Sequence, residues 1–177
     1  MGDLQLTPHF GLTELGGAGA PIWIVDALRQ TAQLLEVVRH ELGDRPLKIT
    51  SGYRTRMDNA RVGGSLDSQH LDGTAADFVV TGLSLFSAYY KLQGAIAAGR
   101  LRVGEIEYSL QDGHIHVSRP TRRDVNQVLI ELREGSSTAQ VTAELLAQFP
   151  GAPTRQQGVV LALAAVGLAV AGATWEA

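Results

Sequence analysis

Cysteine is absent from the 177-residue chain. Its absence excludes a disulfide scaffold, a zinc finger with thiolate ligands, an iron–sulfur cluster and a cysteine nucleophile. Any metal ion that the chain binds must therefore be held by histidine, aspartate or glutamate side chains. Because the chain has only five histidines, this restriction leaves few candidate sites.

Charge is also scarce. Only 19% of the residues are charged, and 15 Lys and Arg against 18 Asp and Glu give a net charge of −3. This near balance gives no electrostatic reason to expect nucleic acid as a partner. A hydrophobic content of 45% excludes a disordered polyanion, and the length is sufficient for one domain with a buried core.

The two ends of the chain differ in character. The first ten residues lack the basic head and the apolar run of a secretory signal, so we expect synthesis in the cytoplasm without a signal peptide. Residues 158–175 carry no charge and reach the lower length limit of a bilayer-spanning helix. We favour membrane contact for this segment. The alternative is a buried helix or an oligomer contact. The expected organisation is a main domain over residues 1–120, a connector with a helix over 121–157, and a hydrophobic helix over 158–175.

Hydrophobic periodicity predicts an α+β fold with a mainly antiparallel sheet and flanking helices. Apolar residues at spacings of three and four predict a helix over Ala27–Leu42, which Gly43 would end, and a second helix over Leu83–Ala98. The expected strands are Leu47–Ser51, Thr74–Val80, Val103–Leu110 and His114–Ser118.

The remaining segments are less regular. Arg54–Gln69 is rich in Gly, Asn, Asp and Ser, which favours a loop, and Gln111-Asp112-Gly113 favours a tight turn. Val125–Leu132 fits a helix or a strand equally well, and Thr138–Phe149 is expected to be a helix.

One candidate for chemistry is the pair His70 and Asp77. His70 would lie in a loop and Asp77 on the following strand, between apolar neighbours on both faces. A carboxylate is costly to bury there unless something pairs with it, and a metal ion is one such partner.

His114-Ile115-His116 is the second candidate, because both histidines point to one face of a strand. His70, Asp77 and either His114 or His116 would supply three zinc ligands and leave a fourth position open, as catalytic sites do. On spacing alone, we favour histidines at the surface or hydrogen-bonded in the core over metal ligands. His9 and His40 have no such context and are expected to be structural or exposed.

Six motifs in order resemble the zinc D,D-carboxypeptidase and L,D- or D,D-endopeptidase family of peptidoglycan peptidases (the M15 type, which includes phage endolysins). The resemblance covers residues 7–119. Its motifs are His9-Phe10-Gly11-Leu12-Thr13-Glu14-Leu15, Ile49-Thr50-Ser51-Gly52-Tyr53-Arg54, Asn59 with Val62-Gly63-Gly64, Ser68-Gln69-His70, Gly73-Thr74-Ala75-Ala76-Asp77 and His114-Ile115-His116-Val117.

The resemblance implies the fold of the zinc D,D-peptidases, which hedgehog-like domains share, with His70, Asp77 and His116 as ligands of Zn²⁺. It also implies that Arg54 binds the carboxylate or carbonyl oxygen of the substrate, a role that suits a planar guanidinium. Ser68 would hydrogen-bond substrate near the site, and His114 would stabilise the oxyanion or lie just outside the ligand shell.

The general base departs from the family pattern. Many members have an acidic residue three positions before the last zinc histidine, where this chain has Gly113. Asp112 is one position away, and Glu105 and Glu107 share a face of the preceding strand. We favour Glu107, because some phage-type relatives carry a glutamate before a similar turn.

The implied function is zinc-dependent hydrolysis of an amide bond in peptidoglycan stem peptides, by a phage-type lytic enzyme that acts on the cell wall or is associated with virions. The alternative is a non-catalytic, zinc-stabilised module with the same fold that binds peptidoglycan or has a structural role in a virion.

Overall fold

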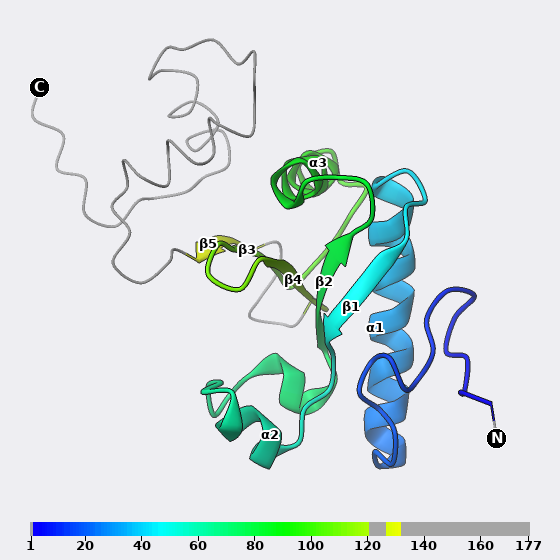
Figure 1. The fold of residues 1–177 in the computed structure, drawn as a ribbon. Coiled ribbons are helices and arrows are strands. Elements are labelled where there is room, and N and C mark those ends of the chain that lie inside the picture. The colour runs from blue at the N-terminus through cyan, green and yellow to red at the C-terminus, as the bar shows by residue number, and fades with distance from the viewer. Residues whose placement is uncertain (1, 121–126, 132–177) are drawn as a thin grey trace, which may run out of the picture. The chain divides into compact units, whose positions relative to one another are not determined.

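A computed structural model describes residues 2–120 and 127–131 of the chain. All described elements belong to one compact unit, Met1–Glu131. Its centre is a five-stranded sheet in the order β1-β2-β4-β3-β5 (Figure 1). The predicted α+β class with a mainly antiparallel sheet is confirmed, since the three pairings among the first four strands are all antiparallel.

The strands are β1 (Leu47–Ser51), β2 (Ala75–Val80), β3 (Glu105–Ser109), β4 (His114–Ser118) and β5 (Gln127–Glu131). The first four lie where the sequence predicts them. For Val125–Leu132, which fitted helix or strand, the structure has the strand β5, and it runs parallel to β3 at the edge of the sheet.

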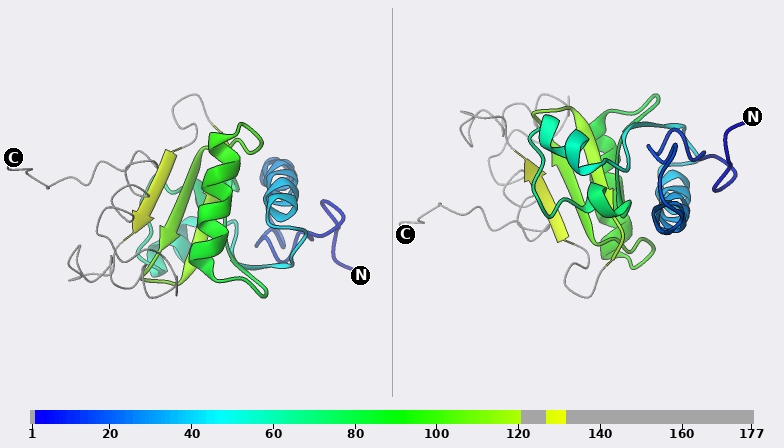
Figure 2. Two further views of the ribbon diagram at one scale, coloured as in Figure 1. Left: turned by 90° about the horizontal axis from the view of Figure 1, so that it is seen from above. Right: turned by 90° about the horizontal axis from the view of Figure 1, so that it is seen from below.

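Three helices surround the sheet: α1 (Ile22–Glu41), α2 (Arg56–Arg61) and α3 (Leu85–Ala97). Figures 1 and 2 show α3 on one side of the sheet, α1 alongside the strands and α2 on the opposite side from α3. Helix α1 begins five residues before the prediction, directly after Pro21. Ile22 and Trp23 at its start are largely exposed, whereas Ile24 and Val25 in the same turn are buried and continue the apolar stripe of the helix.

The predicted loop over Arg54–Gln69 is wrong in part, because it contains α2 and is followed by a 3₁₀ helix, η1 (Gln69–Asp72). The Thr55 hydroxyl accepts a hydrogen bond from the Asp58 N–H and so caps α2. A six-residue helix has no room for an apolar stripe, which is why its polar composition resembles a loop.

The two faces of the sheet differ in the residues that they carry. Alternate residues such as Phe78, Ile106, Ile115 and Val117 are fully buried in the apolar core. The ring of Tyr108 packs against Phe86 and Tyr89 of α3 on this face. The residues between them, which include the two histidines of β4, lie on the other face.

The predicted helix over 138–149 and the predicted hydrophobic helix over 158–175 lie outside the described residues, as does most of the predicted connector over 121–157. No helix among residues 2–120 is both long enough and apolar enough to cross a bilayer.

Candidate metal centre

His70 is held at the sheet by two backbone connections. The chain enters η1 from the α2 loop, and the Arg54 N–H donates to the carbonyl oxygen of His70 at 3.1 Å. The Nδ1–H of His70 donates to the carbonyl oxygen of Gly52, just beyond β1, at 2.6 Å. A carbonyl can only accept, so this bond places the proton on Nδ1 and leaves the Nε2 lone pair of the neutral ring for another partner.

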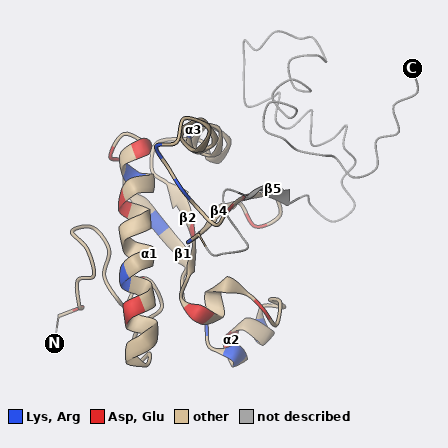
Figure 3. Cartoon of the chain, turned by 180° about the vertical axis from the view of Figure 1, so that it is seen from behind, with Lys and Arg blue, Asp and Glu red and all other residues tan. Residues whose placement is uncertain are grey.

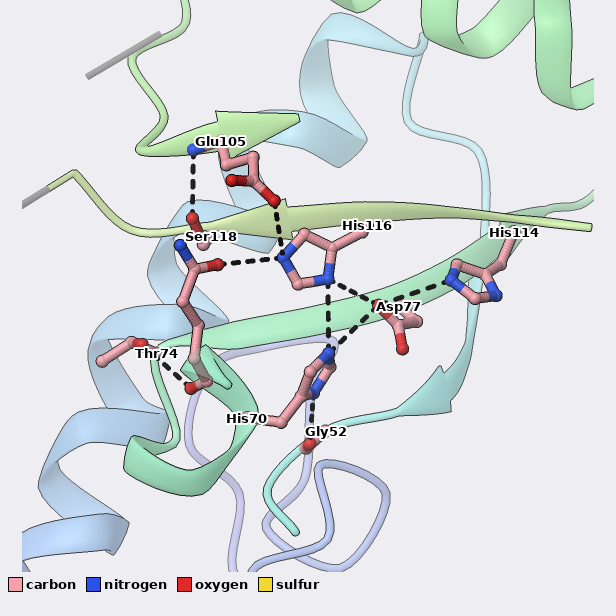
Figure 4. Close-up of polar contacts among 9 residues, drawn as sticks. Gly52, His70, Thr74, Asp77, Glu105, His114, His116 and Ser118 are labelled. Atoms are coloured by element: carbon pink, nitrogen blue, oxygen red, sulfur yellow. Dashed lines mark hydrogen bonds and ion pairs between the residues drawn. The ribbon is translucent and has the colours of Figure 1, made fainter. Parts of the chain in front are cut away.

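Asp77 and His116 meet His70 at one point. Asp77 on β2 lies directly opposite His116 on β4 in the antiparallel register. The Oδ1 of Asp77 is 2.8 Å from the Nδ1 of His116 and 3.2 Å from the Nε2 of His70, and those two nitrogens are 3.2 Å apart. Figure 4 shows the three side chains converging from η1, β2 and β4.

This geometry suits a metal ion. The three side chains can hold one, since each offers a ligand atom within 4.8 Å of the others. In a tetrahedral zinc site with bonds of about 2.0–2.1 Å, ligand atoms lie roughly 3.3 Å apart, close to the spacings found here. His70 and Asp77 are buried, and two nitrogens with one carboxylate oxygen are a common zinc donor set.

The second nitrogen of each histidine is also bound. The Nε2–H of His116 donates to the side-chain oxygen of Gln69 at 3.0 Å, and Glu105 lies 3.8 Å from the same nitrogen. With the Gly52 carbonyl at His70, both rings therefore have an outer acceptor that fixes their tautomer and orientation.

Burial and charge act in opposite directions on the titration of these groups. Burial raises the pKa of Asp77, but hydrogen bonds and the charges of His116 and His70 outweigh it and hold the pKa well below its usual value. Burial lowers the pKa of His116, whereas Asp77, Glu105 and Glu107 raise it, and the net shift is upward. The centre therefore keeps a carboxylate that attracts cations.

Glu107 lies next to this centre. In the β3–β4 pairing it is directly opposite His116, so Asp77, His116 and Glu107 form a row across three neighbouring strands. Side chains directly opposite one another on a sheet face have Cβ atoms about 4.5–5.5 Å apart. Glu105 is one step along the same face, beside the outer nitrogen of His116.

The other predicted site residues lie around the centre. His114 is on the same face of β4, and its Nε2 is 3.7 Å from the Oδ1 of Asp77. Ser68 immediately precedes η1. Asp112 is exposed in the β3–β4 turn, and Arg54 lines a cavity between α1, α2 and η1 whose walls include none of His70, Asp77 and His116.

Sequence reasoning missed Gln69 and the role of the Gly52 carbonyl. Gln69 directly precedes His70, yet its side chain reaches across to His116, 47 positions away. No local pattern marks such a contact. For Gly52 a weak signal existed, because it ends the strand that the sequence predicts over Leu47–Ser51.

Residues 13–118 match the peptidase M15 family. This is more than half of the chain, and it contains every residue of the centre described above. The chain belongs to the peptidase M15 family. The family resemblance noted from the six motifs is thereby confirmed.

The chain also resembles one curated protein over part of its length. Over 43 residues it is 42% identical to the zinc D-Ala-D-Ala carboxypeptidase of Streptomyces albus G, a stretch that is 24% of this chain and 17% of that protein. The chain therefore matches less than a fifth of this relative's length. Three findings support zinc as the cofactor. They are the family, the relative's name, and a group of side chains that could hold a metal ion.

Proposed function

We propose that this chain is a zinc metallopeptidase that hydrolyses an amide bond in the stem peptides of peptidoglycan. The observation that carries the proposal is the convergence of His70, Asp77 and His116 at 2.8–3.2 Å on one side of a sheet in a peptidase M15 chain. The zinc D-Ala-D-Ala carboxypeptidase to which a stretch of the chain is similar supports the choice of substrate class.

In this proposal His70, Asp77 and His116 hold the metal ion. A bound Zn²⁺ would polarise the scissile carbonyl and lower the pKa of a coordinated water toward about 7. The chain's own contribution is the fixed orientation of the two histidine ligands, which the Gly52 carbonyl and the Gln69 side chain enforce.

Glu107 is the proposed general base. Its place opposite His116 puts its carboxylate on the face where substrate would meet the metal ion. There it would take a proton from the attacking water and later give one to the leaving amine. Asp112, the sequence alternative, lies exposed in the turn beyond the strand ends.

Three further side chains complete the proposal. His114 would stabilise the developing oxyanion from its place 3.7 Å from Asp77, an effect worth roughly 3–4 kcal/mol in comparable sites. Ser68 would hydrogen-bond substrate at the start of η1. Arg54 would bind a substrate carboxylate or carbonyl oxygen with its guanidinium.

Digestion of purified murein with and without a chelator tests the function. The proposal expects soluble products whose masses identify one cleaved amide bond, and it expects chelation to abolish them. His70→Ala and Asp77→Ala should lose both zinc and hydrolysis. Full activity in either variant, or tight murein binding without any product, would contradict the proposal; the second result identifies a non-catalytic binding module.

Three points stay predictions. They are whether the chain is an endopeptidase or a carboxypeptidase, whether it has a phage-type lytic role, and whether residues 158–175 contact a membrane. The product masses decide the first. Comparing murein release by the chain and by a version ending at residue 157 tests whether the last segment adds to the activity.

A further inference from the structure

A cavity of about 310 Å³ lies beside the metal centre, between the first turn of α1, the start of α2 and η1. We call it the α1–α2 pocket. Its principal lining residues are Trp23, Tyr53, Arg54, Arg56, Leu71 and Asp72.

The pocket shares two chain segments with the metal centre. Tyr53 follows Gly52, whose carbonyl holds the His70 ring, and Leu71 follows His70 itself. The Tyr53 N–H donates to the carbonyl oxygen of Leu15 at 2.8 Å, so this wall is anchored to the body of the domain. The pocket and the metal centre are therefore neighbours along the chain at two points.

The pocket has an excess of unpaired positive charge. Arg54 and Arg56 line it against a single carboxylate, that of Asp72. Neither arginine forms an ion pair within residues 2–120. Arg61, at the other end of the same short helix, is paired with Asp58 at 2.9 Å (Figure 3 shows the charges around α2).

Two further features indicate what the pocket would take. The Nε of Arg54 is buried without an acceptor in the described part of the chain, a state that is costly until an acceptor arrives. Trp23 is 68% exposed although it is a large apolar side chain, and it forms an aromatic wall of the same pocket. A guanidinium pair beside an aromatic wall suits a carboxylate carried on a short aliphatic chain.

We propose that the α1–α2 pocket binds a carboxylate-bearing residue of the peptide substrate, away from the bond that is cut, with Arg56 as the charge-recognising side chain and Trp23 as the wall. This inference rests on the proposed function for the identity of the peptide. It assigns a subsite to residues of α1 and α2 that the metal centre does not use.

The test compares two stem pentapeptides that differ in one group. L-Ala-γ-D-Glu-L-Lys-D-Ala-D-Ala carries a free carboxylate on its second residue, and its isoglutamine form carries a carboxamide there. KM and kcat are measured on the zinc-loaded full chain. Binding is measured by calorimetry on the zinc-loaded Glu107→Gln chain, in which bound peptide should not be turned over.

Arg56→Ala should weaken binding of the acidic peptide about tenfold, the loss expected for one charge-assisted pair, and should raise KM with kcat unchanged. The amidated peptide should bind weakly to both versions. Arg61→Ala is the matched control, because this arginine is on the same helix but outside the pocket, and it should change neither constant. Circular dichroism verifies that both variants are folded, and Arg56→Gln repeats the test with a longer side chain.

Equal effects of Arg56→Ala and Arg61→Ala, equal binding of the two peptides, or no binding of either would overturn the subsite. The two proposals fail in different ways. If the acidic peptide is bound through Arg56 but never cut, the subsite is supported and the peptidase function is contradicted. If both peptides are cut with equal KM, the peptidase function is supported and the subsite is contradicted.

Discussion

The two histidines of the metal centre offer different ring nitrogens to the same point. His70 presents Nε2 because its Nδ1–H is held by the Gly52 carbonyl, and His116 presents Nδ1 because its Nε2–H is held by Gln69. Each tautomer is thus set by a residue that is not itself a ligand. The side chain of Gln69 is therefore expected to control how tightly the centre holds zinc.

Gln69→Ala should lower zinc affinity by about 10- to 100-fold, because the His116 ring loses the acceptor that orients it. Gln69→Glu keeps an acceptor oxygen at the same reach and should stay within a few-fold of the native affinity. Competition with a fluorescent zinc chelator measures both. Native affinity in Gln69→Ala would show that the contact does not orient the ring.

Glu107→Gln should retain zinc but lose about 10²- to 10⁴-fold in kcat, since the amide cannot take up the water proton. Asp112→Asn, in the exposed turn, should change kcat by less than about twofold. Zinc content is measured in the same samples as the rate. A large loss in the Asp112 variant with a small one in the Glu107 variant would reverse the assignment of the base.

At the residue scale, alternation predicted the candidate ligands, whereas the preference for Glu107 over Glu105 came from the family resemblance alone. The alternation on the two strands already showed that Glu105 and Glu107 share a face, as do His114 and His116. Which glutamate lies opposite His116 depends on the register, which the length of the turn sets and alternation does not. The contact from Gln69 depends on the tertiary fold and has no signal in the sequence.

At the scale of elements, the junction after β1 supports the centre through close backbone packing. A Cβ on Gly52 would overlap the carbonyl group of Leu15, whose oxygen accepts the Tyr53 N–H. Gly52→Ala should therefore cost about 1–3 kcal/mol and displace the carbonyl that holds His70.

Gly94→Ala is the matched control for that substitution. Gly94 lies inside α3, where an added methyl group would meet no atom within 4 Å, so the change should stabilise the chain by about 0.5–1 kcal/mol. Urea denaturation measures both variants, and zinc affinity should fall only in Gly52→Ala. Equal stability of the two variants would contradict the role of the close approach.

A second element contact attaches the N-terminal segment to α1. The carboxylate of Glu36 accepts from the His9 N–H at 3.0 Å and lies 2.8 Å from its ring Nδ1. Partial burial raises the pKa of Glu36, but hydrogen bonds from this segment and the interaction with His9 outweigh it, so the pKa lies below its usual value.

A lowered carboxylate pKa in the folded state stabilises the fold above the unfolded-state value of 4.5, and this contribution is lost as the pH falls through the lowered pKa. Glu36→Gln should therefore destabilise the chain by about 1 kcal/mol at pH 7 and by nothing measurable near pH 2. Asp26→Asn, an exposed site on the same helix, is the control. A pH-independent difference in urea denaturation would contradict this account.

The elements were predictable to different degrees for identifiable reasons. The strands of the antiparallel hairpins and the central turns of α1 have apolar residues at the right period, so the sequence reveals them. The first turn of α1 is an unbroken apolar run, Ile22–Val25, in which exposed and buried residues look alike in the sequence. Helix α2 is too short for an apolar stripe and depends on the Thr55 cap. At 127–131 the apolar run is too short to separate helix from strand until pairing with β3 decides it.

At the scale of the whole molecule, the fold separates a stabilising face from a chemical one. The core face of the sheet carries the apolar residues that pack under α1 and α3, while the opposite face carries Asp77, His116, His114 and Glu107. Because the chain has no cysteine, a metal centre in it must use histidine and carboxylate ligands. The described domain has one such group of three residues with converging ligand atoms.

The most direct test of this account is a zinc titration of the metal-free chain, read as the rate of amide hydrolysis on a stem pentapeptide. The rate should rise in proportion to added zinc, reach a plateau at about one zinc per chain, and stay at baseline in His116→Ala. A chain that binds one zinc and still releases no amine, or one that cuts the peptide at full rate without zinc, would contradict it.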